Sequence, residues 1–311
     1  MGPVLITGAA GFLGSNLAAH LARRGRATWL VARAAPGEGP EEGPAAERVL
    51  VGPAGPISLE LGPELARCDA VVHLASATNP RRGGLEDELD QLRELGQVLA
   101  AAAACGRPPR VVWCSSGGTV YGEGDRPHGE DDPTRPASAH AWGKVAGEAL
   151  IAAERARTGV PASVLRCANV YGPRQVVRRQ GLVMALLEDL RAGRATELWG
   201  DGEEVRDYVY VDDVCELVAR VVGLEPADRR ADLLNVGSGA GTTVREVVAA
   251  VTTVTGRAPR LRWAPAPPGL IRRNVLEVER AAALGWRATT PLREGIARTW
   301  AWLEGRCASP T

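Results

Sequence analysis

Lys144 is the residue whose type stands out first, because it is the only lysine among the 37 basic residues of this 311-residue chain. Arginine can supply a surface charge almost anywhere, whereas lysine offers a compact ammonium on a flexible stem. A single lysine in an arginine background indicates a position where a planar guanidinium would not fit. The sequence therefore marks Lys144 as a candidate functional cation.

A glycine-rich segment near the start of the chain has the spacing of a dinucleotide-binding loop. Gly8, Gly11 and Gly14 follow a short apolar run and open an amphipathic stretch. In such a strand–turn–helix the glycines permit the tight turn, the approach of the backbone to a pyrophosphate, and the packing of helix on strand. Free N–H groups at the start of the helix attract the phosphates. The expected cofactor contacts along the chain are Gly8, Gly11, Phe12, Leu13, Gly14 and Leu74.

The end of the second expected strand bears on the choice of cofactor. An acidic residue there would bind the ribose 2′-hydroxyl of NAD. The strand instead ends at Ala32 and is followed by Arg33, and an arginine suits the 2′-phosphate of NADP. The sequence therefore favours NADP as the cofactor, with NAD as the alternative. If Arg33 is only a solvated loop residue, it does not bear on this choice.

Composition argues against several classes of protein. The formal net charge is zero, so no electrostatic footprint indicates nucleic acid or an anionic membrane as partner. No apolar run is long enough to span a bilayer. The six cysteines form no Cys-x-x-Cys pair and none lies at metal-ligand spacing from a histidine, so we expect no metal site. The first residues lack the features of a signal peptide, so a cytoplasmic location is expected.

An alternation of strands and helices must position these residues. Short apolar runs predict buried strands at Val4–Ile6, Thr28–Val31, Ala70–Leu74, Val111–Cys114 and Ser163–Leu165. Helical patterns lie between several of them, at Gly14–Arg24, Leu85–Cys105 and Ala141–Arg157. This alternation predicts an α/β fold, a Rossmann doubly wound parallel sheet covered on both faces.

The second half is less regular and predicts a smaller C-terminal α/β substrate lobe. Helices are expected at Leu182–Ala192, Asp213–Val222, Val244–Val254 and Pro291–Leu303, and strands at Tyr208–Val211 and Leu233–Val236. We expect residues 1–170 to form the dinucleotide-binding domain, with about 205–237 returning to it. Residues 171–311 would form most of a substrate-binding lobe over the carboxyl ends of the sheet, where ligands bind in such folds.

Three further motifs follow the glycine loop in a fixed order. They are Val120-Tyr121-Gly122, the run from Asn169 to Arg174, and the run from Arg206 to Asp213. In this combination the chain resembles, from Val4 to about Trp302, the NAD-dependent epimerase/dehydratase family of extended short-chain dehydrogenases, many of which act on nucleotide sugars. The resemblance implies a Rossmann domain, a nicotinamide cofactor, and often a homodimer built on two helices per subunit, here Leu85–Cys105 and Ala141–Arg157.

The resemblance also exposes a departure in the catalytic residues. Family members usually pair a tyrosine, which transfers a proton to or from a sugar oxygen, with a lysine four residues later that binds the nicotinamide ribose. Lys144 matches the lysine, but His140 stands in the tyrosine position. The family's Ser/Thr position is Gly117, beside Ser116. The expected catalytic residues are therefore His140, Lys144 and Ser116.

Three hypotheses account for this departure. In the favoured one, His140 replaces the tyrosine as the proton donor, since imidazole titrates near neutral pH. In the second, the site only binds nucleotides or a partner. In the third, another group such as Tyr121 or Ser116 carries a different step.

By resemblance, Asn169 and Arg206 would contact the substrate phosphates, and Thr119 and Tyr121 would complete the substrate contacts. An ion pair of Arg206 with Asp207 or Asp213 is the structural alternative. The family's further phosphate-binding arginine is missing from Pro267-Pro268-Gly269-Leu270, and Arg272 or Arg273 could reach in instead.

The residues that follow Gly117 reduce the number of reactions that the protein could catalyse. Dehydratases and decarboxylases of the family carry an acidic residue there, and Gly118 and Thr119 offer none. We expect an NAD(P)-dependent ketoreductase acting on a nucleotide-linked keto sugar, because a reductase exchanges its cofactor and NADP is favoured. A sugar epimerase of the same family is the alternative, and a nucleotide-binding protein without redox turnover is the alternative from another class.

Overall fold

The computed structural model describes residues 2–32, 48–51, 62–75, 84–175, 181–267 and 269–305. Its main layer is a seven-stranded sheet in which every neighbouring pair is parallel. The order is β10-β6-β5-β4-β1-β2-β3, so the direction of winding reverses beside β1. The strands are β1 (Val4–Thr7), β2 (Thr28–Ala32), β3 (Arg48–Val51), β4 (Ala70–His73), β5 (Arg110–Ser116), β6 (Ala162–Cys167) and β10 (Leu233–Val236). A sheet of this order opens a ligand crevice where the winding reverses, at the carboxyl ends of β1 and β4.

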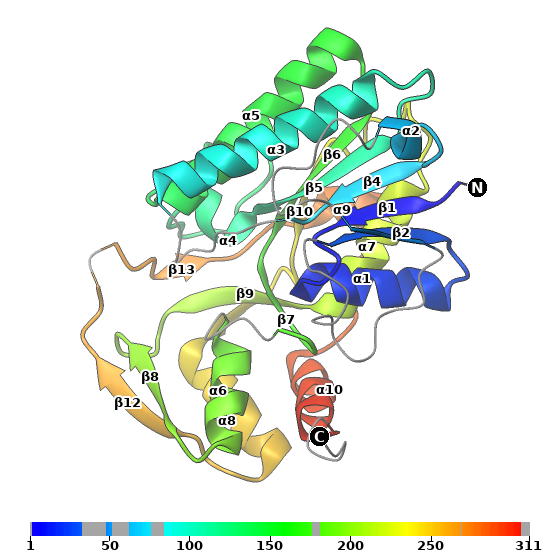
Figure 1. Cartoon of the computed structure of the whole chain (residues 1–311). Helices are drawn as coiled ribbons and strands as arrows, with labels where there is room; N and C mark the ends of the chain where they lie inside the picture. The colour runs from blue at the N-terminus through cyan, green and yellow to red at the C-terminus, as the bar shows by residue number, and fades with distance from the viewer. Residues whose placement is uncertain are drawn as a thin grey trace.

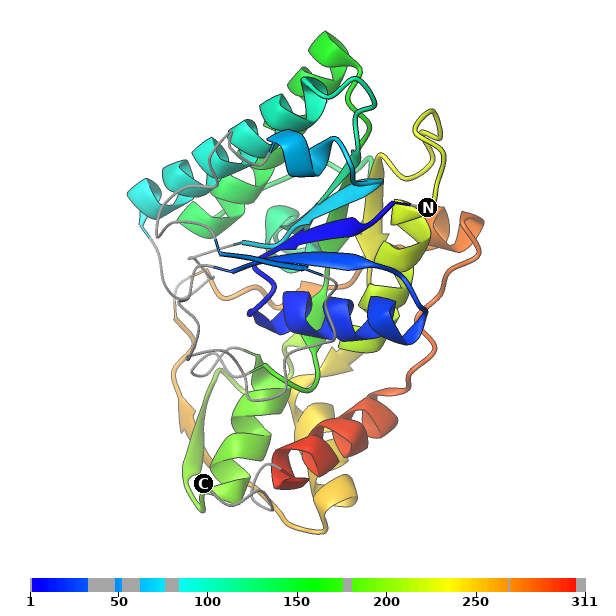
Figure 2. The same ribbon diagram turned by 45° about the vertical axis from the view of Figure 1, so that its right-hand side comes forward.

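Helices cover both faces of this sheet, as Figures 1 and 2 show. Val4 and Ile6 of β1 pack in the same core cluster as α1 (Phe12–Arg23) and α7 (Val211–Val222). Leu5, between them, packs on the opposite face with α3 (Leu85–Ala103), α5 (Ala139–Thr158) and the short α2 (Gly62–Leu65). Because both faces are buried, each strand can be apolar throughout. None of the helices in the described ranges is long and apolar enough to cross a membrane.

A second group of elements forms the lower lobe of Figure 1. Its strands make one sheet of β11, β9 and β13 with β7 beside β9, and a two-stranded sheet of β8 and β12. The chain returns from β9 to the main sheet through α7 and β10. The remaining elements are α4 (Gly117–Val120), β7 (Asn169–Tyr171), α6 (Leu182–Arg191), β8 (Ala195–Trp199), β9 (Val205–Tyr210), β11 (Gly241–Thr243), α8 (Val244–Thr255), β12 (Arg260–Ala264), β13 (Arg273–Asn274), α9 (Glu279–Ala283) and α10 (Leu292–Gly305).

The expected Rossmann α/β fold is confirmed, and the long elements agree with the sequence patterns to within about two residues. Strand β9 begins at Val205 rather than Tyr208, and α7 begins at Val211 rather than Asp213. The sequence did not predict the short strands β3, β7, β11 and β13, nor β8 and β12. Strand β12 is largely exposed and lacks a clear apolar pattern. The division between domains at residue 170 stays a prediction.

One carboxylate ties the C-terminal segment to the main layer. Asp213, in the first turn of α7, accepts hydrogen bonds from the backbone N–H groups of Thr289 and Thr290, both at 3.1 Å, and from the Thr289 hydroxyl at 3.0 Å. The Trp286 indole donates to its backbone carbonyl at 2.9 Å. Asp213 is buried, so its carboxylate relies on these donors for its hydrogen bonds.

Replacing Asp213 should therefore weaken the fold where α10 joins it. We expect Asp213→Ala to lower the free energy of unfolding by about 2–3 kcal/mol, because it removes a buried, charged acceptor of three hydrogen bonds. Asp212→Ala is the matched control, since that more exposed carboxylate makes only a 3.8 Å ion pair with Arg23 and should change stability by about 0.5 kcal/mol or less. Urea unfolding of both variants measures the difference, and equal effects would contradict this account.

Candidate active site

The glycine loop between β1 and α1 has no room for side chains. Gly8 has a φ of +67°, and a Cβ placed on it would lie 2.7 Å from the backbone of Leu74 and Ala75. A Cβ on Gly14 would lie 2.3 Å from the Gly8 carbonyl oxygen. Gly11 caps α1 without a side chain, so the first-turn N–H groups are open to an anion. The loop fits the pyrophosphate of a dinucleotide.

The crevice beside this loop is closed by the end of β4. Thr7 Oγ1 lies 2.8 Å from His73 Nδ1 and accepts hydrogen bonds from the N–H groups of Leu74, at 3.2 Å, and Ala75, at 3.3 Å. His73 is thus a buried hydrogen-bonding residue and not an exposed catalyst. These bonds place Leu74 at the mouth of the glycine loop, where a cofactor contact was expected.

The residues that bear on NADP are only partly described. Strand β2 ends at Ala32 as expected, so no acidic side chain stands at its end. Arg33 lies outside the described residues. The preference for NADP therefore stays a prediction.

Lys144 reaches from α5 to the carboxyl end of β5. Its Nζ donates to the Cys114 carbonyl oxygen at 3.0 Å and lies 4.5 Å from the centre of the Trp113 ring. Burial lowers the pKa of the ammonium, although Cys114 and Glu88 act in the opposite direction. The lone lysine is therefore a partly buried cation held at the edge of the sheet where the ligand crevice opens.

His140 lies one helical turn before Lys144 on the same face of α5. Its Nδ1 is 3.4 Å from Oε1 of Glu88 on α3. Burial, and secondarily the charge of Lys144, lowers the pKa of His140 to about 4. At neutral pH the side chain is therefore a neutral imidazole beside a cation.

Gly117, which the resemblance places at the family's Ser/Thr position, has little room for a side chain. A Cβ on Gly117 would lie 2.6 Å from Leu276 Cδ1 and 2.8 Å from the Arg166 carbonyl oxygen. A serine cannot stand there unless Leu276 moves. Two hydroxyls remain nearby, because Ser116 ends β5 and Thr119 Oγ1 donates to the Ser116 carbonyl at 3.4 Å.

Tyr121 does not have the position expected of a substrate contact. It is 1% exposed, its ring stacks on His128 at 4.8 Å, and its hydroxyl donates to Asn235 Oδ1 and accepts from Arg166 Nη1, both at 2.7 Å. Burial raises the pKa of this phenol. The expectation is corrected here: Tyr121 is a core residue of a polar network, because the lobe segments fold over it.

Asn169 and Arg206 lie on neighbouring parallel strands, β7 and β9, where Asn169 pairs with Tyr208, two residues after Arg206. Asn169 Nδ2 donates to the Asp207 carbonyl at 2.9 Å. Arg206 donates to the carbonyls of Val205, at 2.9 Å, and Ile271, at 2.5 Å. These acceptors are backbone carbonyls, not the carboxylates of Asp207 or Asp213. Burial lowers the pKa of the Arg206 guanidinium, so a partly desolvated cation lies on the strand next to that of the Asn169 amide.

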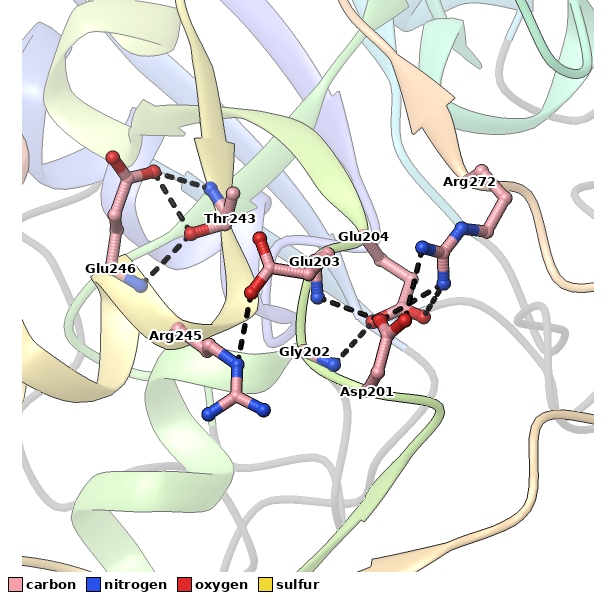
Figure 3. Close-up of polar contacts among 8 residues, drawn as sticks. All are labelled: Asp201, Gly202, Glu203, Glu204, Thr243, Arg245, Glu246 and Arg272. Atoms are coloured by element: carbon pink, nitrogen blue, oxygen red, sulfur yellow. Dashed lines mark hydrogen bonds and ion pairs between the residues drawn. The ribbon is translucent and has the colours of Figure 1, made fainter.

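Arg272 is already paired with two carboxylates, those of Asp201 and Glu204, as Figure 3 shows. Its guanidinium bonds Asp201 at 3.0 Å and Glu204 at 2.7 Å, and Glu204 also accepts the Gly202 N–H at 3.1 Å. Arg273 on β13 pairs with Val205, the residue before Arg206 on β9. Successive residues of a strand point to opposite faces of the sheet, so Arg273 and Arg206 lie on opposite faces. Neither arginine therefore replaces the missing phosphate residue beside Arg206.

The geometry defines a Rossmann dinucleotide-binding protein with a lysine–histidine pair at the crevice. The model of the NAD dependent epimerase/dehydratase family matches residues 4–237. The chain therefore belongs to this family.

Individual relatives match along nearly the whole chain. A UDP-glucose 4-epimerase of Mycolicibacterium smegmatis is 36% identical over 304 residues, which cover 95% of this chain and 96% of that protein. The structure of MoeE5 in complex with UDP-glucuronic acid and NAD has 33% identity and a TM-score of 0.84, covering 98% of this chain and 100% of that one. The Thermus thermophilus UDP-glucose 4-epimerase in complex with NAD has 31% identity and a TM-score of 0.83, covering 97% and 99%.

Glu88 is the site residue that sequence reasoning missed. It is 3% exposed, although it stands in an acidic first turn. A signal was present, because Glu88 lies seven residues before the buried Leu95 and eleven before the buried Leu99. That spacing puts a carboxylate on the apolar face of α3.

The contacts of Lys144 predict the effect of replacing it by arginine. We expect Lys144→Arg to weaken nicotinamide cofactor binding and turnover about tenfold or more, because the planar guanidinium cannot occupy the slot between Cys114 and Trp113. Titration of NAD and NADP into the variant measures the loss. Arg157→Lys, on the exposed end of α5, is the control and should bind like the parent. Parent-like affinity in Lys144→Arg would refute a special role for the lone lysine.

Proposed function

We propose that this protein is an NAD-dependent 4-epimerase of a nucleotide-linked hexose. The observation that carries the proposal is the His140–Lys144 pair at the carboxyl end of β5, in a chain whose nearly full-length relatives include a UDP-glucose 4-epimerase. The lowered pKa of His140 agrees with it. The alternative that the sequence favoured, a ketoreductase, needs a protonated donor at the start of its reaction. An epimerase needs the opposite, a base that first takes a proton from the sugar hydroxyl and later returns it.

The pKa of His140 separates these two cases. With a pKa of about 4, roughly one imidazole in a thousand is protonated at pH 7. A reductase relying on this donor would lose most of its rate at neutral pH. An epimerase does not depend on a proton held in the resting state, because its imidazole becomes protonated only when it takes the proton of the sugar hydroxyl.

The residues present fit a nicotinamide dinucleotide. The glycine loop and the α1 N-terminus would hold the pyrophosphate, and Lys144 would hold the nicotinamide ribose. When bound, NAD would supply the acceptor and donor of the hydride. His140 would take and return the hydroxyl proton, and Ser116 or Thr119 would hold the same sugar oxygen. Asn169 and Arg206 would bind the substrate phosphates.

Two observations support a nucleotide hexose as the substrate class. Two relatives that match the chain almost from end to end are named UDP-glucose 4-epimerase, and a neighbouring structure holds UDP-glucuronic acid. Gly118 and Thr119 offer no acid after Gly117, which argues against dehydration. UDP-glucose is therefore the first substrate to test.

A ketoreductase is the second candidate because Ala32 ends β2 without an acidic side chain. That feature favours NADP, which a reductase would exchange at each turnover. A protein that binds the nucleotide without turnover is the outcome expected if neither reaction occurs.

A homodimer is part of the proposal. Leu85 and Leu89 on α3 and Trp142 on α5 are 65%, 44% and 61% exposed. Large apolar side chains this exposed on two packed helices indicate a surface for a second copy of the chain. Sedimentation of the purified protein would show whether it is dimeric.

The role of His140 predicts a pH profile. Because the base must be neutral, activity should persist through neutral pH and fall only as pH drops through about 4, the pKa of His140. His140→Ala should lower kcat about a hundredfold or more. His140→Tyr should keep part of the activity with its acid limb moved to higher pH, since a phenol loses its proton less readily.

These outcomes are measured as initial rates of UDP-glucose epimerisation, with thermal unfolding confirming that each variant is folded. An alanine variant as active as the parent would eliminate His140 as the base. It would leave Ser116 or a binding-only protein.

The cofactor distinguishes the two candidate reactions. A recycling epimerase should retain NAD through purification and epimerise without added cofactor, whereas a reductase should consume NADPH with a 4-keto sugar. Mass spectrometry of the purified protein, and absorbance at the reduced-nicotinamide band, measure the two properties. NADPH consumption without epimerisation would replace the epimerase by the ketoreductase.

A further inference from the structure

A buried carboxylate faces the imidazole of the site. Oε1 of Glu88 and Nδ1 of His140 lie 3.4 Å apart, with the two side chains 4% and 11% exposed. Within the described part of the chain neither atom has a hydrogen-bond partner. A buried polar atom without a partner is costly, so this pair calls for an explanation beyond packing.

The absence of a side chain at Gly143 on α5 leaves space for the Glu88 carboxylate. A Cβ on Gly143 would lie 2.1 Å from Glu88 Oε2 and 2.8 Å from its Cδ, so any larger residue would displace the carboxylate. The other side of the group is held by Gln91, whose Nε2 donates to Oε2 at 3.3 Å. Gly143 and Gln91 together direct Oε1 toward His140.

We propose that Glu88 is a positioning residue that accepts the Nδ1–H of His140 and so keeps the lone pair on Nε2, where it takes the proton of the sugar hydroxyl. The role of Nε2 rests on the proposed epimerase function. The hydrogen bond itself does not.

The charges around the ring explain why an anion is needed. Lys144 on α5 opposes an imidazolium, while Glu88 on α3 favours it and Gln91 is neutral. Cys114 on β5 lies beyond Lys144, against its Nζ. When Nε2 takes the proton of the sugar hydroxyl, the imidazole ring becomes a cation. Glu88 then faces a charged Nδ1–H, and a contact that is long in the resting state shortens.

The hydrogen bond can be tested without substrate or cofactor. Nitrogen-15 NMR of the histidines, with His140 assigned from the His140→Ala spectrum, reports which ring nitrogen carries the proton. We expect the Nδ1–H tautomer in the parent and a shift toward the Nε2–H tautomer in Glu88→Ala. Gly143→Ala, which keeps the carboxylate but denies it its slot, should shift the tautomer in the same direction. Glu86→Ala, exposed on the same helix, is the matched control and should leave the spectrum unchanged.

A double-mutant cycle then tests the link to turnover. Glu88→Gln keeps the shape of the side chain and removes its charge, so it should lower kcat about tenfold or more with little change in KM. In the His140→Tyr background the same substitution should cost almost nothing, because no Nδ1–H remains to be held. A purely structural role would cost the same in both backgrounds.

The outcomes separate this inference from the proposed function. Parent-like tautomers in both Glu88→Ala and Gly143→Ala, or equal costs in the two backgrounds, would overturn the role of Glu88. A shifted tautomer in a protein that epimerises no nucleotide sugar would support the hydrogen bond and overturn the epimerase.

Discussion

The close approach of α5 to the sheet and to α3 is the constraint on which the site depends. A Cβ on Gly147 would lie 2.5 Å from the Trp113 ring, and one on Gly143 would lie 2.1 Å from the Glu88 carboxylate. These two glycines are one helical turn apart, so they form a single flat stripe on α5. The adjacent stripe carries His140 and Lys144. Any larger residue on the glycine stripe would move both functional side chains away from the ends of the strands.

The same packing fixes the groups around the carboxyl end of β5. Leu276 occupies the space beside Gly117 where a serine would stand, and Tyr121 is locked between Arg166 and Asn235. Arg166 is in turn paired with Glu148 of α5. The charge of Lys144 acts on His140 one helical turn away and is itself favoured by Glu88. An imidazole needs support that a phenol does not, since burial and Lys144 both disfavour its charged form, and Glu88 is placed to supply it.

Sequence patterns predicted the main sheet well because both of its faces are buried. Strands such as Val4–Thr7 are apolar throughout and stand between glycine turns and amphipathic helices, a pattern with few other interpretations. The lobe was harder to predict. Strands β8 and β12 form a sheet of only two strands. In β12 the residues Arg260, Arg262 and Trp263 are all exposed, so buried and exposed residues do not alternate as they do in a half-buried strand. Pairing between segments more than sixty residues apart decided that sheet.

The sequence alone determined the class of fold, the glycine loop, the lone Lys144 and the histidine four residues before it, because these are local patterns of residue type and spacing. The tertiary structure decided which of these groups meet and in what state. It placed the carboxylate of Glu88, fifty-two positions earlier, against His140 and withdrew Tyr121 into the core. Protonation depends on burial and on neighbouring charges brought together from separate elements. That is why the sequence could name His140 as a candidate proton donor, whereas only the folded molecule shows the burial and the charges that surround its ring.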